Sequence, residues 1–387
     1  MARFGDGIGT SHDLLDAASQ AVRAALGPLA GRTPDLVCAF VSGGSPDEAA
    51  AAGMRVAELA GAASMLGCSA GGVIGGGRGV EDQGAVSVWA AALPGVRLRT
   101  FHLEVLRADA GAAVVGLPER EDDEVAVLLA DPFSFPVDGF VRRANDVLAG
   151  LPIVGGLAAG PQGAGSTRLF IDGRVVDRGA VGVLLAGDVG ARAVVSQGCR
   201  AVGPAMTVTG AAGNVLLELA GVPAVAKVQQ VLAALTPVEQ ALASGGLQIG
   251  IAADEYAEEH EFLVRGLLGT EPQTGGLAVG DRVEVGRTVR LQVRDADAAD
   301  AELRALLARS RDRGAGPVGG ALLFSCNGRG AALFGPAYGG ADHDVEVVRR
   351  ELATSGVAGF FAGGEIGPVA GRNHLHGFTA SLLAFRD

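Results

Sequence analysis

The chain has 387 residues, of which 49% are hydrophobic and 19% are charged, as in globular domains that bury a large core. Its 31 basic and 43 acidic side chains give a formal net charge of −12, which argues against a nucleic acid or an anionic membrane surface as partner. Lys227 is the single lysine, which excludes a Gly-Lys phosphate loop and a lysine catalyst at any other position.

The first part of the chain reads as a buried strand between two helices. Residues 11–26 are amphipathic and stop at Gly27, which predicts a helix. Residues 36–41 are continuously apolar, as in a strand covered on both faces. Residues 45–48, Ser-Pro-Asp-Glu, have the form of a capping box with proline in the first turn, so a second helix should begin there and end near Gly61.

The dominant pattern along the chain is an internal repeat of strand, helix, Gly-rich segment and strand. Copies one, two and four share this order, whereas the third copy is degenerate and has no room for its helix. The leading strands are expected at residues 36–41, 125–130, 247–252 and 321–325, the Gly-rich segments at 65–72, 153–160 and 357–364, and the closing strands at 84–93, 179–186, 286–293 and 377–385.

Further helices are predicted at residues 298–313 and 342–355, each of which ends at a glycine. The continuously apolar strands favour sheets that are covered on both faces. We therefore predict an α/β fold of two related lobes of mixed β-sheet with outer helices, built from strand-helix-strand-Gly-loop-strand repeats. The first lobe is expected over residues 1–218 and the second over residues 219–387.

The segment at residues 67–71, Gly-Cys-Ser-Ala-Gly, matches the hydrolase pattern with Ser69 as nucleophile. That mechanism needs a helix after the serine turn, and the Gly-rich residues 73–79 cannot start one. A glycine turn that brings the backbone close to a ligand or to a second sheet is therefore preferred, with Cys68 and Ser69 as candidate ligand contacts. The Gly-rich residues 5–9 resemble a dinucleotide loop only faintly, because no strand and helix flank them in the required order.

The C-terminal third holds most of the candidate site residues. Residues 325–330 directly follow an apolar strand, and two further polar, Gly-rich segments follow at residues 363–368 and 372–377. Polar groups on loops at the ends of buried strands often line small-molecule sites. One pocket is expected to include Cys326, Asn327, Arg329, Glu365, Asn373, His374 and His376. Alternatively, Arg329 and Glu365 pair internally and the histidines are satisfied turn residues.

Three kinds of chemistry are conceivable for this region. His374 and His376 have the spacing that places both side chains on one face of a strand, but no further tight Cys/His cluster supports a zinc site. A single axial histidine would suffice to bind haem, so haem binding remains an alternative. No other cofactor is predicted. Cys326 and a nearby histidine could form a nucleophilic pair, although a buried, inert thiol is the commoner outcome.

Together these motifs resemble the FIST family, in which FIST N and FIST C domains occur in tandem in bacterial signalling proteins and in a eukaryotic F-box protein. The N-terminal signature is similar at residues 65–72, 152–158 and 171–175, and the C-terminal signature at residues 323–330, 363–368 and 376–379. Val73 stands where many relatives carry glutamate, which puts an acidic role at that position in doubt.

The resemblance implies a sensory module for a small ligand, with amino acids or their derivatives proposed, and a haem-binding, nitric-oxide-sensing subgroup. We expect Arg329 to meet an anionic group of the ligand and Glu365 to meet an ammonium group. The alternatives are a haem-based nitric-oxide sensor with His374 or His376 as axial ligand, and an enzyme that depends on Cys326. The Gly turns of the two lobes are expected to face one shared cleft.

The expected setting is a cytoplasmic sensor without catalytic turnover. Residues 1–20 lack the apolar core of a secretory signal, and prolines and glycines interrupt the long uncharged run at residues 147–167, so membrane insertion is not expected. Four widely spaced cysteines fit a reducing compartment. Because the chain ends two residues past its last predicted strand, output is expected to pass through a separate signalling protein.

Overall fold

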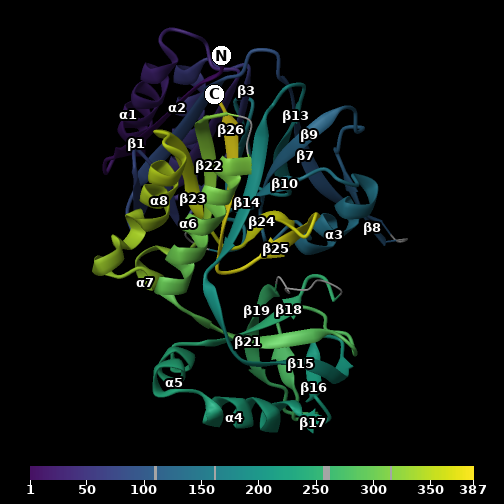
Figure 1. The fold of residues 1–387 in the computed structure, drawn as a ribbon. Helices are drawn as coiled ribbons and strands as arrows, with labels where there is room; N and C mark the ends of the chain where they lie inside the picture. Colours follow the sequence, from purple (N-terminus) through teal and green to yellow (C-terminus); the bar gives the residue numbers. More distant parts are fainter. Residues whose placement is uncertain (109–110, 161–162, 256–261, 314–315) are drawn as a thin grey trace. The chain divides into compact units, whose positions relative to one another are not determined.

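The computed structural model describes residues 1–387 except residues 109–110, 161–162, 256–261 and 314–315. The described residues form a mixed α/β fold in which four sheets carry outer helices, which confirms the predicted fold class (Figure 1). The chain divides into two compact units. Unit 1 comprises residues 1–196, 303–375 and 379–387, and unit 2 comprises residues 197–302 and 376–378.

The first sheet of unit 1, sheet 1, is built mainly from the N-terminal residues. Its order is β1 (Arg3–Thr10), β6 (Ala85–Ala92), β2 (Leu36–Ser42), β3 (Ser64–Ala70), β11 (Leu169–Ile171) and β12 (Arg174–Val176). Helices α1 (Leu14–Leu26) and α2 (Pro46–Ala60) belong to this region, with the short 3-10 turn η1 (Gly27–Leu29) after α1. The predicted capping box at Ser45 and Glu48 is confirmed, and Gly61 ends α2 in the left-handed conformation.

The glycines of residues 5–9 belong to strand β1, not to a nucleotide-binding loop. A Cβ atom added to Gly5, Gly7 or Gly9 would collide with a backbone carbonyl oxygen of helix α1. Alternate glycines therefore let α1 lie directly on this strand, which explains the pattern without a ligand.

Sheets 2 and 3 complete unit 1. Sheet 2 has the order β25 (Arg372–His376), β24 (Glu365–Val369), β10 (Ile153–Leu157), β9 (Asp123–Ala130), β13 (Ala180–Ala186), β7 (Arg97–Ala108) and β8 (Gly111–Val115), with helix α3 (Val137–Val147). Sheet 3 has the order β14 (Ala191–Gln197), β26 (Thr379–Arg386), β22 (Val318–Cys326), β23 (Gly356–Ala362), β4 (Gly72–Gly75) and β5 (Arg78–Glu81). The helical segments of this part of the chain are α6 (Ala296–Arg313), α7 (Gly330–Leu333), η2 (Pro336–Tyr338), η3 (Gly340–Asp342) and α8 (His343–Leu352).

One topology recurs in these three sheets. Each contains two parallel strands joined through a helix (β2 and β3, β9 and β10, β22 and β23) and an antiparallel closing strand (β6, β13 or β26) beside the first of them. The strands match the predicted leading, Gly-rich and closing segments of copies one, two and four. That these segments are copies of one ancestral sequence stays a prediction.

The three sheets also exchange hairpins, a feature that sequence reasoning missed. Hairpin β4–β5 precedes the closing strand β6 of the first repeat but pairs with β23 of sheet 3, and β11–β12 precedes the closing strand β13 of the second repeat but pairs with β3 of sheet 1. Hairpin β24–β25 precedes the closing strand β26 of the last repeat and pairs with β10 of sheet 2. Each sheet is therefore completed by residues from another repeat, in a closed cycle.

A single large hydrophobic core joins the three sheets of unit 1. Phe40 of β2 lies 5.1 Å from Phe360 of β23, and Trp89 of β6 lies 5.2 Å from Phe385 of β26, measured between ring centroids. Trp89 Nε1 also donates to the Gly356 carbonyl at 3.1 Å. The compact units therefore differ from the two predicted segments, because residues 303–387, apart from 376–378, belong with residues 1–196.

Unit 2 contains sheet 4 and its own core. The sheet has the order β15 (Cys199–Ala212), β21 (Thr288–Arg294), β18 (Leu247–Ala252), β19 (Phe262–Thr270), β20 (Leu277–Val279), β16 (Val215–Leu219) and β17 (Val222–Pro223), with helices α4 (Ala224–Ala234) and α5 (Pro237–Ser244). Strands β18 and β19 pair antiparallel, so the third copy lacks the helical crossover, as predicted.

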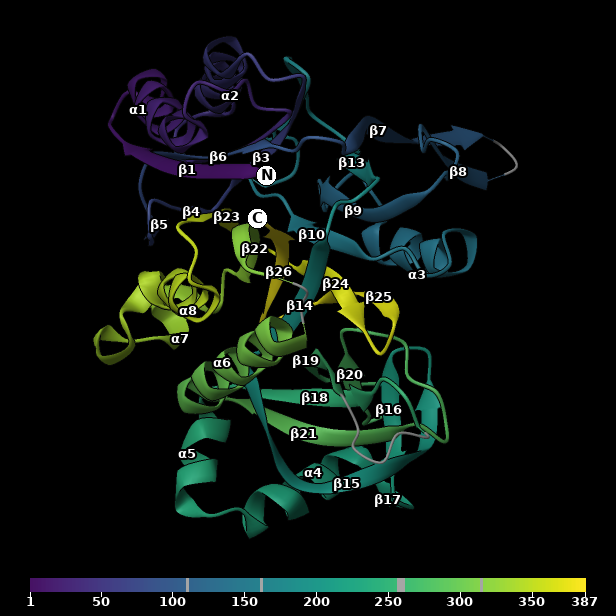
Figure 2. The same cartoon turned by 45° about the horizontal axis from the view of Figure 1, so that its top comes forward.

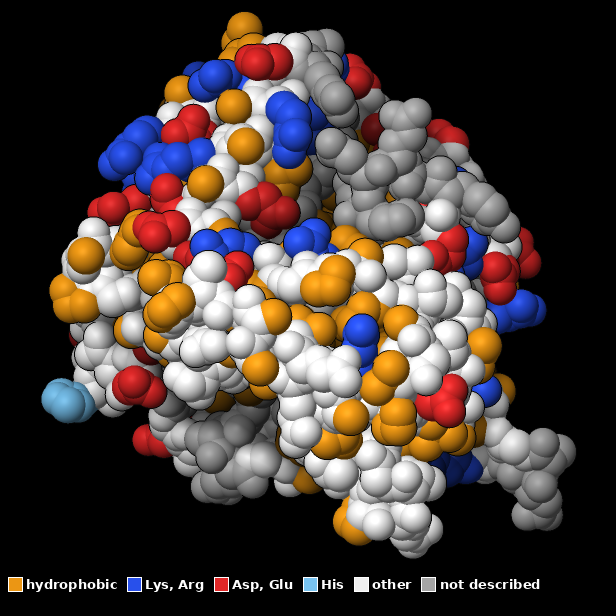
Figure 3. All heavy atoms as spheres, turned by 60° about the horizontal axis from the view of Figure 1, so that its bottom comes forward, with side chains coloured by type: hydrophobic (Ala, Val, Ile, Leu, Met, Phe, Trp, Pro, Cys, Tyr) orange, Lys and Arg blue, Asp and Glu red, His pale blue; other side chains and the backbone are white. Residues whose placement is uncertain are grey.

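One stretch of unit 2 is poor in charge. Residues 209–250 contain three charged side chains, Glu218, Lys227 and Glu239. The space-filling view shows a face on which hydrophobic and uncharged side chains predominate over charged ones near the centre (Figure 3). In the part of the chain that the structure describes, no helix combines the length and the apolar character needed to cross a membrane.

Candidate functional site

A group of buried polar side chains lies at the carboxyl end of strand β22 in unit 1. We call it the polar cluster, and it consists of Ser325, Cys326, Arg329, His343, Asp344, Glu365 and Thr379. The chain turns sharply after β22, because Arg329 N donates to the Cys326 carbonyl at 2.8 Å and Asn327 N donates to the Ala362 carbonyl at 2.9 Å. This turn sends the side chain of Arg329 back into the protein, where it is fully buried.

Arg329 forms a two-point ion pair with Asp344 at the start of helix α8. Its Nε donates to Oδ2 at 2.8 Å and its Nη2 donates to Oδ1 at 2.9 Å. The guanidinium also lies over the ring of Phe334, 5.2 Å from the centroid. The planar fork that was expected to meet an anionic ligand is thus held by a carboxylate of the protein itself.

Asp344 joins two further members to the cluster. Ser325 Oγ donates to its Oδ2 at 2.6 Å, and His343 Nδ1 lies 2.9 Å from its Oδ1. Burial by itself would raise the pKa of Asp344, but the charge and hydrogen bonds of Arg329, with help from His343, hold it well below its ordinary range. The carboxylate therefore stays ionised at every physiological pH.

Glu365, the first residue of β24, has the opposite electrostatic character although it is equally buried. Its Oε2 accepts hydrogen bonds from Thr379 N at 3.1 Å and Thr379 Oγ1 at 2.8 Å, while Oε1 receives none from the described residues. Burial raises the pKa of Glu365 to about 8, against the lowering effects of Thr379, the Cys326 thiol and the charge of Arg329. At neutral pH its carboxyl group is mainly protonated and uncharged.

Cys326 is buried, and its surroundings are polar. Gly328 N donates to its Sγ at 3.4 Å, and the thiol lies 3.6 Å from Oδ1 of Asn327, whose side chain is exposed. The thiol therefore lies between the exposed turn at Asn327 and the buried carboxyl of Glu365.

The N-terminal half contributes to this region through the exchanged hairpin β4–β5. Glu81 of β5 accepts a hydrogen bond from Ala331 N at 2.8 Å, at the start of the short helix α7. Gly79 N donates to Asp342 Oδ1 at 2.8 Å. The first Gly turn and the two C-terminal Gly loops thus all belong to unit 1, as do the contacts between them.

Cys68 and Ser69 lie elsewhere in unit 1. Ser69 Oγ accepts from Arg168 N at 2.9 Å, and Ser69 N donates to the Arg168 carbonyl at 2.8 Å, so this serine links β3 to the segment before β11. Cys68 lies in the hydrophobic core, where burial raises its pKa well above the ordinary value. Strand β4 follows β3 where a hydrolase would have a helix, which agrees with the rejection of a serine nucleophile.

The remaining predicted residues, Asn373, His374 and His376, lie on β25. Asn373 Oδ1 accepts from Ile153 N and its Nδ2 donates to the Leu151 carbonyl, both at 2.8 Å, which fixes β25 beside the start of β10. His374 is half-buried and His376 is buried. Over the described residues, no group of three or more His, Cys, Asp or Glu side chains is arranged to hold a metal ion.

Sequence reasoning missed Ser325, His343, Asp344, Thr379 and Glu81. One signal could have revealed Asp344, because it shares helical spacing with the buried Val347 and Val348 of α8, so an acid occupies the apolar face of that helix. The other residues carry no such signal, because their partners are distant in sequence.

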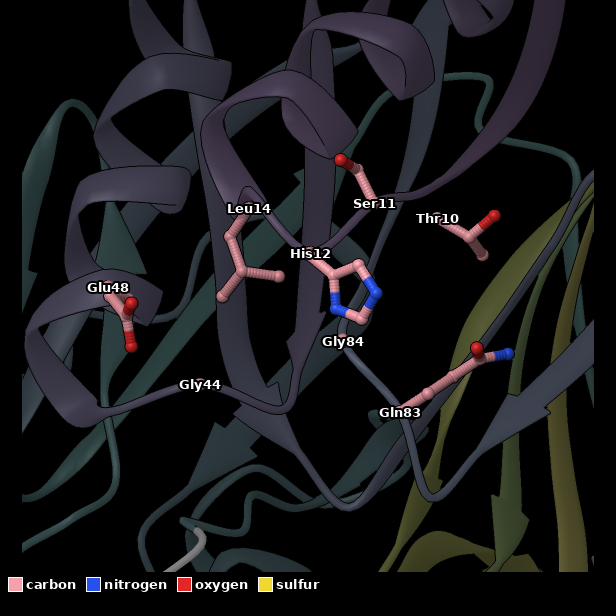
Figure 4. Close-up of a pocket in the computed structure, with 8 residues that line it drawn as sticks. All are labelled: Thr10, Ser11, His12, Leu14, Gly44, Glu48, Gln83 and Gly84. Carbon is pink, nitrogen blue, oxygen red and sulfur yellow. The ribbon is translucent and has the colours of Figure 1, made fainter.

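A separate pocket of about 360 Å³ opens at the carboxyl ends of β1 and β2. Figure 4 shows the His12 ring in the middle, with Glu48 on one side and Gln83 and Thr10 on the other. In the repeated topology this pocket corresponds to the position of the polar cluster in sheet 3. Asp13 and Glu48 already cap the two helices that start here, so the pocket does not favour an anion.

The repeated sheets and the buried cluster occur in a chain that matches two adjacent domain families. The FIST N domain family matches residues 35–222, and the FIST C domain family matches residues 224–368. The chain therefore belongs to the FIST family, with both domains in tandem.

The similar curated proteins come from mycobacteria and span the whole chain. The uncharacterized protein Rv0628c of Mycobacterium tuberculosis strain H37Rv is 43% identical over 389 residues, which cover 100% of both chains. The uncharacterized protein Mb0898c of Mycobacterium bovis is 42% identical over 389 residues, covering 100% of this chain and 99% of that protein. With these relatives, the similarity extends over the full length of the chain. Their names state no ligand.

Proposed function

We propose that this protein is a sensor that binds a small ligand, an amino acid or a derivative, and passes the signal to a separate protein without catalytic turnover. FIST domains are associated with small-ligand sensing and signalling, and both domains are present. The observation that carries the proposal is Glu365, a fully buried carboxyl group with one oxygen that receives no hydrogen bond from the described residues. Burying such a group costs free energy unless a hydrogen-bond or ionic partner contacts its second oxygen.

The chemistry of the cluster favours an amine as the group that completes it. An ammonium ion next to Glu365 would stabilise the ionised carboxylate and so offset the effect of burial. An anionic group, by contrast, would have to compete with Asp344 for Arg329. The ligand's ammonium group is therefore assigned to Glu365, and its carboxylate to backbone N–H groups near the turn after β22.

The alternatives rest on single residues of the same region. For a cysteine-dependent enzyme, a histidine would have to activate Cys326, whereas His343 directs Nδ1 to Asp344. For a haem-based nitric-oxide sensor, His374 or His376 would have to be the axial ligand. Expression with haem tests the second alternative by the presence of a Soret band, and alkylation of Cys326 over a pH series tests the first.

The proposal is tested by thermal-shift screening of the standard amino acids and their amine derivatives. At least one should raise the melting temperature of the wild type and of Glu104→Gln, which changes an exposed carboxylate, but not that of Glu365→Gln. Arg329→Ala is unsuitable as a binding variant because it would leave Asp344 buried without its cation. If every compound leaves the wild type unchanged, or if Glu365→Gln responds as the wild type does, the proposal fails.

A further inference from the structure

Strands β7 and β8 extend sheet 2 into a two-stranded arm. Strand β13 pairs with residues 97–103 of β7, whereas β8 pairs with residues 104–108, the part of β7 beyond β13. Both ribbon views show this hairpin on the side of unit 1 away from helices α1, α2 and α8 and near α3 (Figures 1 and 2). A two-stranded ribbon of this kind is only marginally stable in water unless something covers it.

One face of the arm is covered and the other is open. Val105 and Val114 pack against the hydrophobic cluster that includes Phe135 and α3. On the opposite face the side chain of Leu106 is 56% exposed and that of Val115 is 37% exposed. The open face thus presents apolar side chains to solvent on a projecting element.

Strand β8 is an edge strand of sheet 2, and among the described residues no further strand pairs with its outer edge. Its sequence, residues 111–115, is Gly-Ala-Ala-Val-Val, which contains no charge and no proline. Natural edge strands are normally protected by lysine, proline or a bulge, because their unpaired N–H and C=O groups can form hydrogen bonds with another strand. The edge of β8 is therefore available for pairing.

We propose that β8 pairs antiparallel with β8 of a second copy of this chain, across a twofold axis at Ala113. In this register Ala112 faces Val114 of the second copy, Gly111 faces Val115, and Ala113 faces Ala113. The arms then form a continuous four-stranded ribbon, which has the number of strands that a sheet with an apolar face needs.

Size and charge favour a second copy as the occupant. The large side chains of one β8 lie opposite the small ones of the other, so no two large side chains face each other across the paired strands. Although the whole chain carries a net charge of −12, β8 is uncharged and the paired part of β7 carries one acid and one base, Glu104 and Arg107. The arm is thus a place where two acidic molecules can meet without opposing like charges.

The size of the contact sets its strength. Five residues on each side bury less than the roughly 1,200 Å² that stable complexes need, so the dimer should be weak and dependent on concentration. A dissociation constant in the micromolar range is expected.

Sedimentation of the full chain between low and high micromolar concentration tests the proposal. The wild type should pass from monomer to dimer, and Ala113→Lys should weaken the dimer by about tenfold, because two lysines would then face each other on the axis. Ala63→Lys, at an exposed position away from the arm, should leave the dimer unchanged.

Disulfide trapping gives a second measurement that does not depend on how well Ala113→Lys folds. Ala113→Cys should form a covalent dimer on mild oxidation, because facing residues of antiparallel strands lie within disulfide range. The wild type and Ala63→Cys should not. A strictly monomeric wild type, a dimer that Ala113→Lys leaves intact, or the absence of trapping through Ala113→Cys would each overturn the proposal.

Discussion

Arg329 and Asp344 show how a charge pair can be buried completely and still be stable. Two parallel hydrogen bonds join the pair, and a third from Ser325 and a contact from His343 replace water that Asp344 loses on folding. Removing one partner would leave the other as an uncompensated charge in the interior. The pair therefore fixes the turn after β22, and with it the position of Cys326.

Arg329→Ala should accordingly destabilise the protein by about 3–5 kcal/mol. Arg329→Met combined with Asp344→Leu should lose much less, because both charges are then absent. Trp89, the single tryptophan, lies in the shared core of unit 1, so urea unfolding followed by its fluorescence measures the effect. Equal losses in the single and the double variant would show that the charge balance is not what matters.

Glu365 should make the folded protein less stable as the pH rises. Its pKa is raised in the folded state from 4.5 to about 8, so its contribution to stability is fully present below 4.5 and is lost as the pH rises through 8. The melting temperature of the wild type should fall between pH 6 and pH 9, and that of Glu365→Gln should fall less. A parallel decline in both proteins would show that Glu365 is already ionised in the folded state.

At the scale of elements, the contact between β1 and α1 depends on alternate glycines. Gly7→Ala should destabilise the protein by about 1–3 kcal/mol, because its Cβ would meet the backbone of α1 at Ala21. Gly27 offers a matched control, since it has helical backbone angles and open space around its Cβ position. Gly27→Ala should be neutral or slightly stabilising by thermal denaturation, and a Gly7→Ala protein as stable as this control would contradict the packing argument.

The elements that sequence reasoning predicted are those whose signals are local. The capping box at Ser45, the apolar strands and the missing helix of the third copy could all be derived from neighbouring residues. Strand β1 was missed because its glycines resemble a loop, and the hairpin exchange was missed because the strands that pair lie far apart in sequence. The same limit applies to the site: Arg329 and Glu365 stand out on Gly-rich loops, whereas Asp344 and Thr379 join them only through tertiary packing.

For the whole molecule, the exchanged hairpins mean that sheets 2 and 3 of unit 1 each combine strands from both family domains. A fragment of residues 1–222 lacks β24–β25 for sheet 2, and its hairpin β4–β5 lacks β23. The part of the shared core that packs against β22, β23 and β26 would also be exposed. This fragment should show no cooperative unfolding transition alone and should gain one when mixed with residues 223–387, as followed by circular dichroism. A cooperative transition in the isolated fragment would contradict this account of the fold.

The central claim is that an amine ligand completes the buried carboxyl of Glu365, and calorimetric titration at pH 7 in two buffers of different ionisation enthalpy tests it most directly. A compound found by thermal shift should bind the wild type with release of a proton, because Glu365 is mainly protonated before binding and ionised after it. Binding to Glu365→Gln should be lost or greatly weakened, with no linked proton. Equal affinity in both proteins, or binding to the wild type without proton release, would contradict the claim.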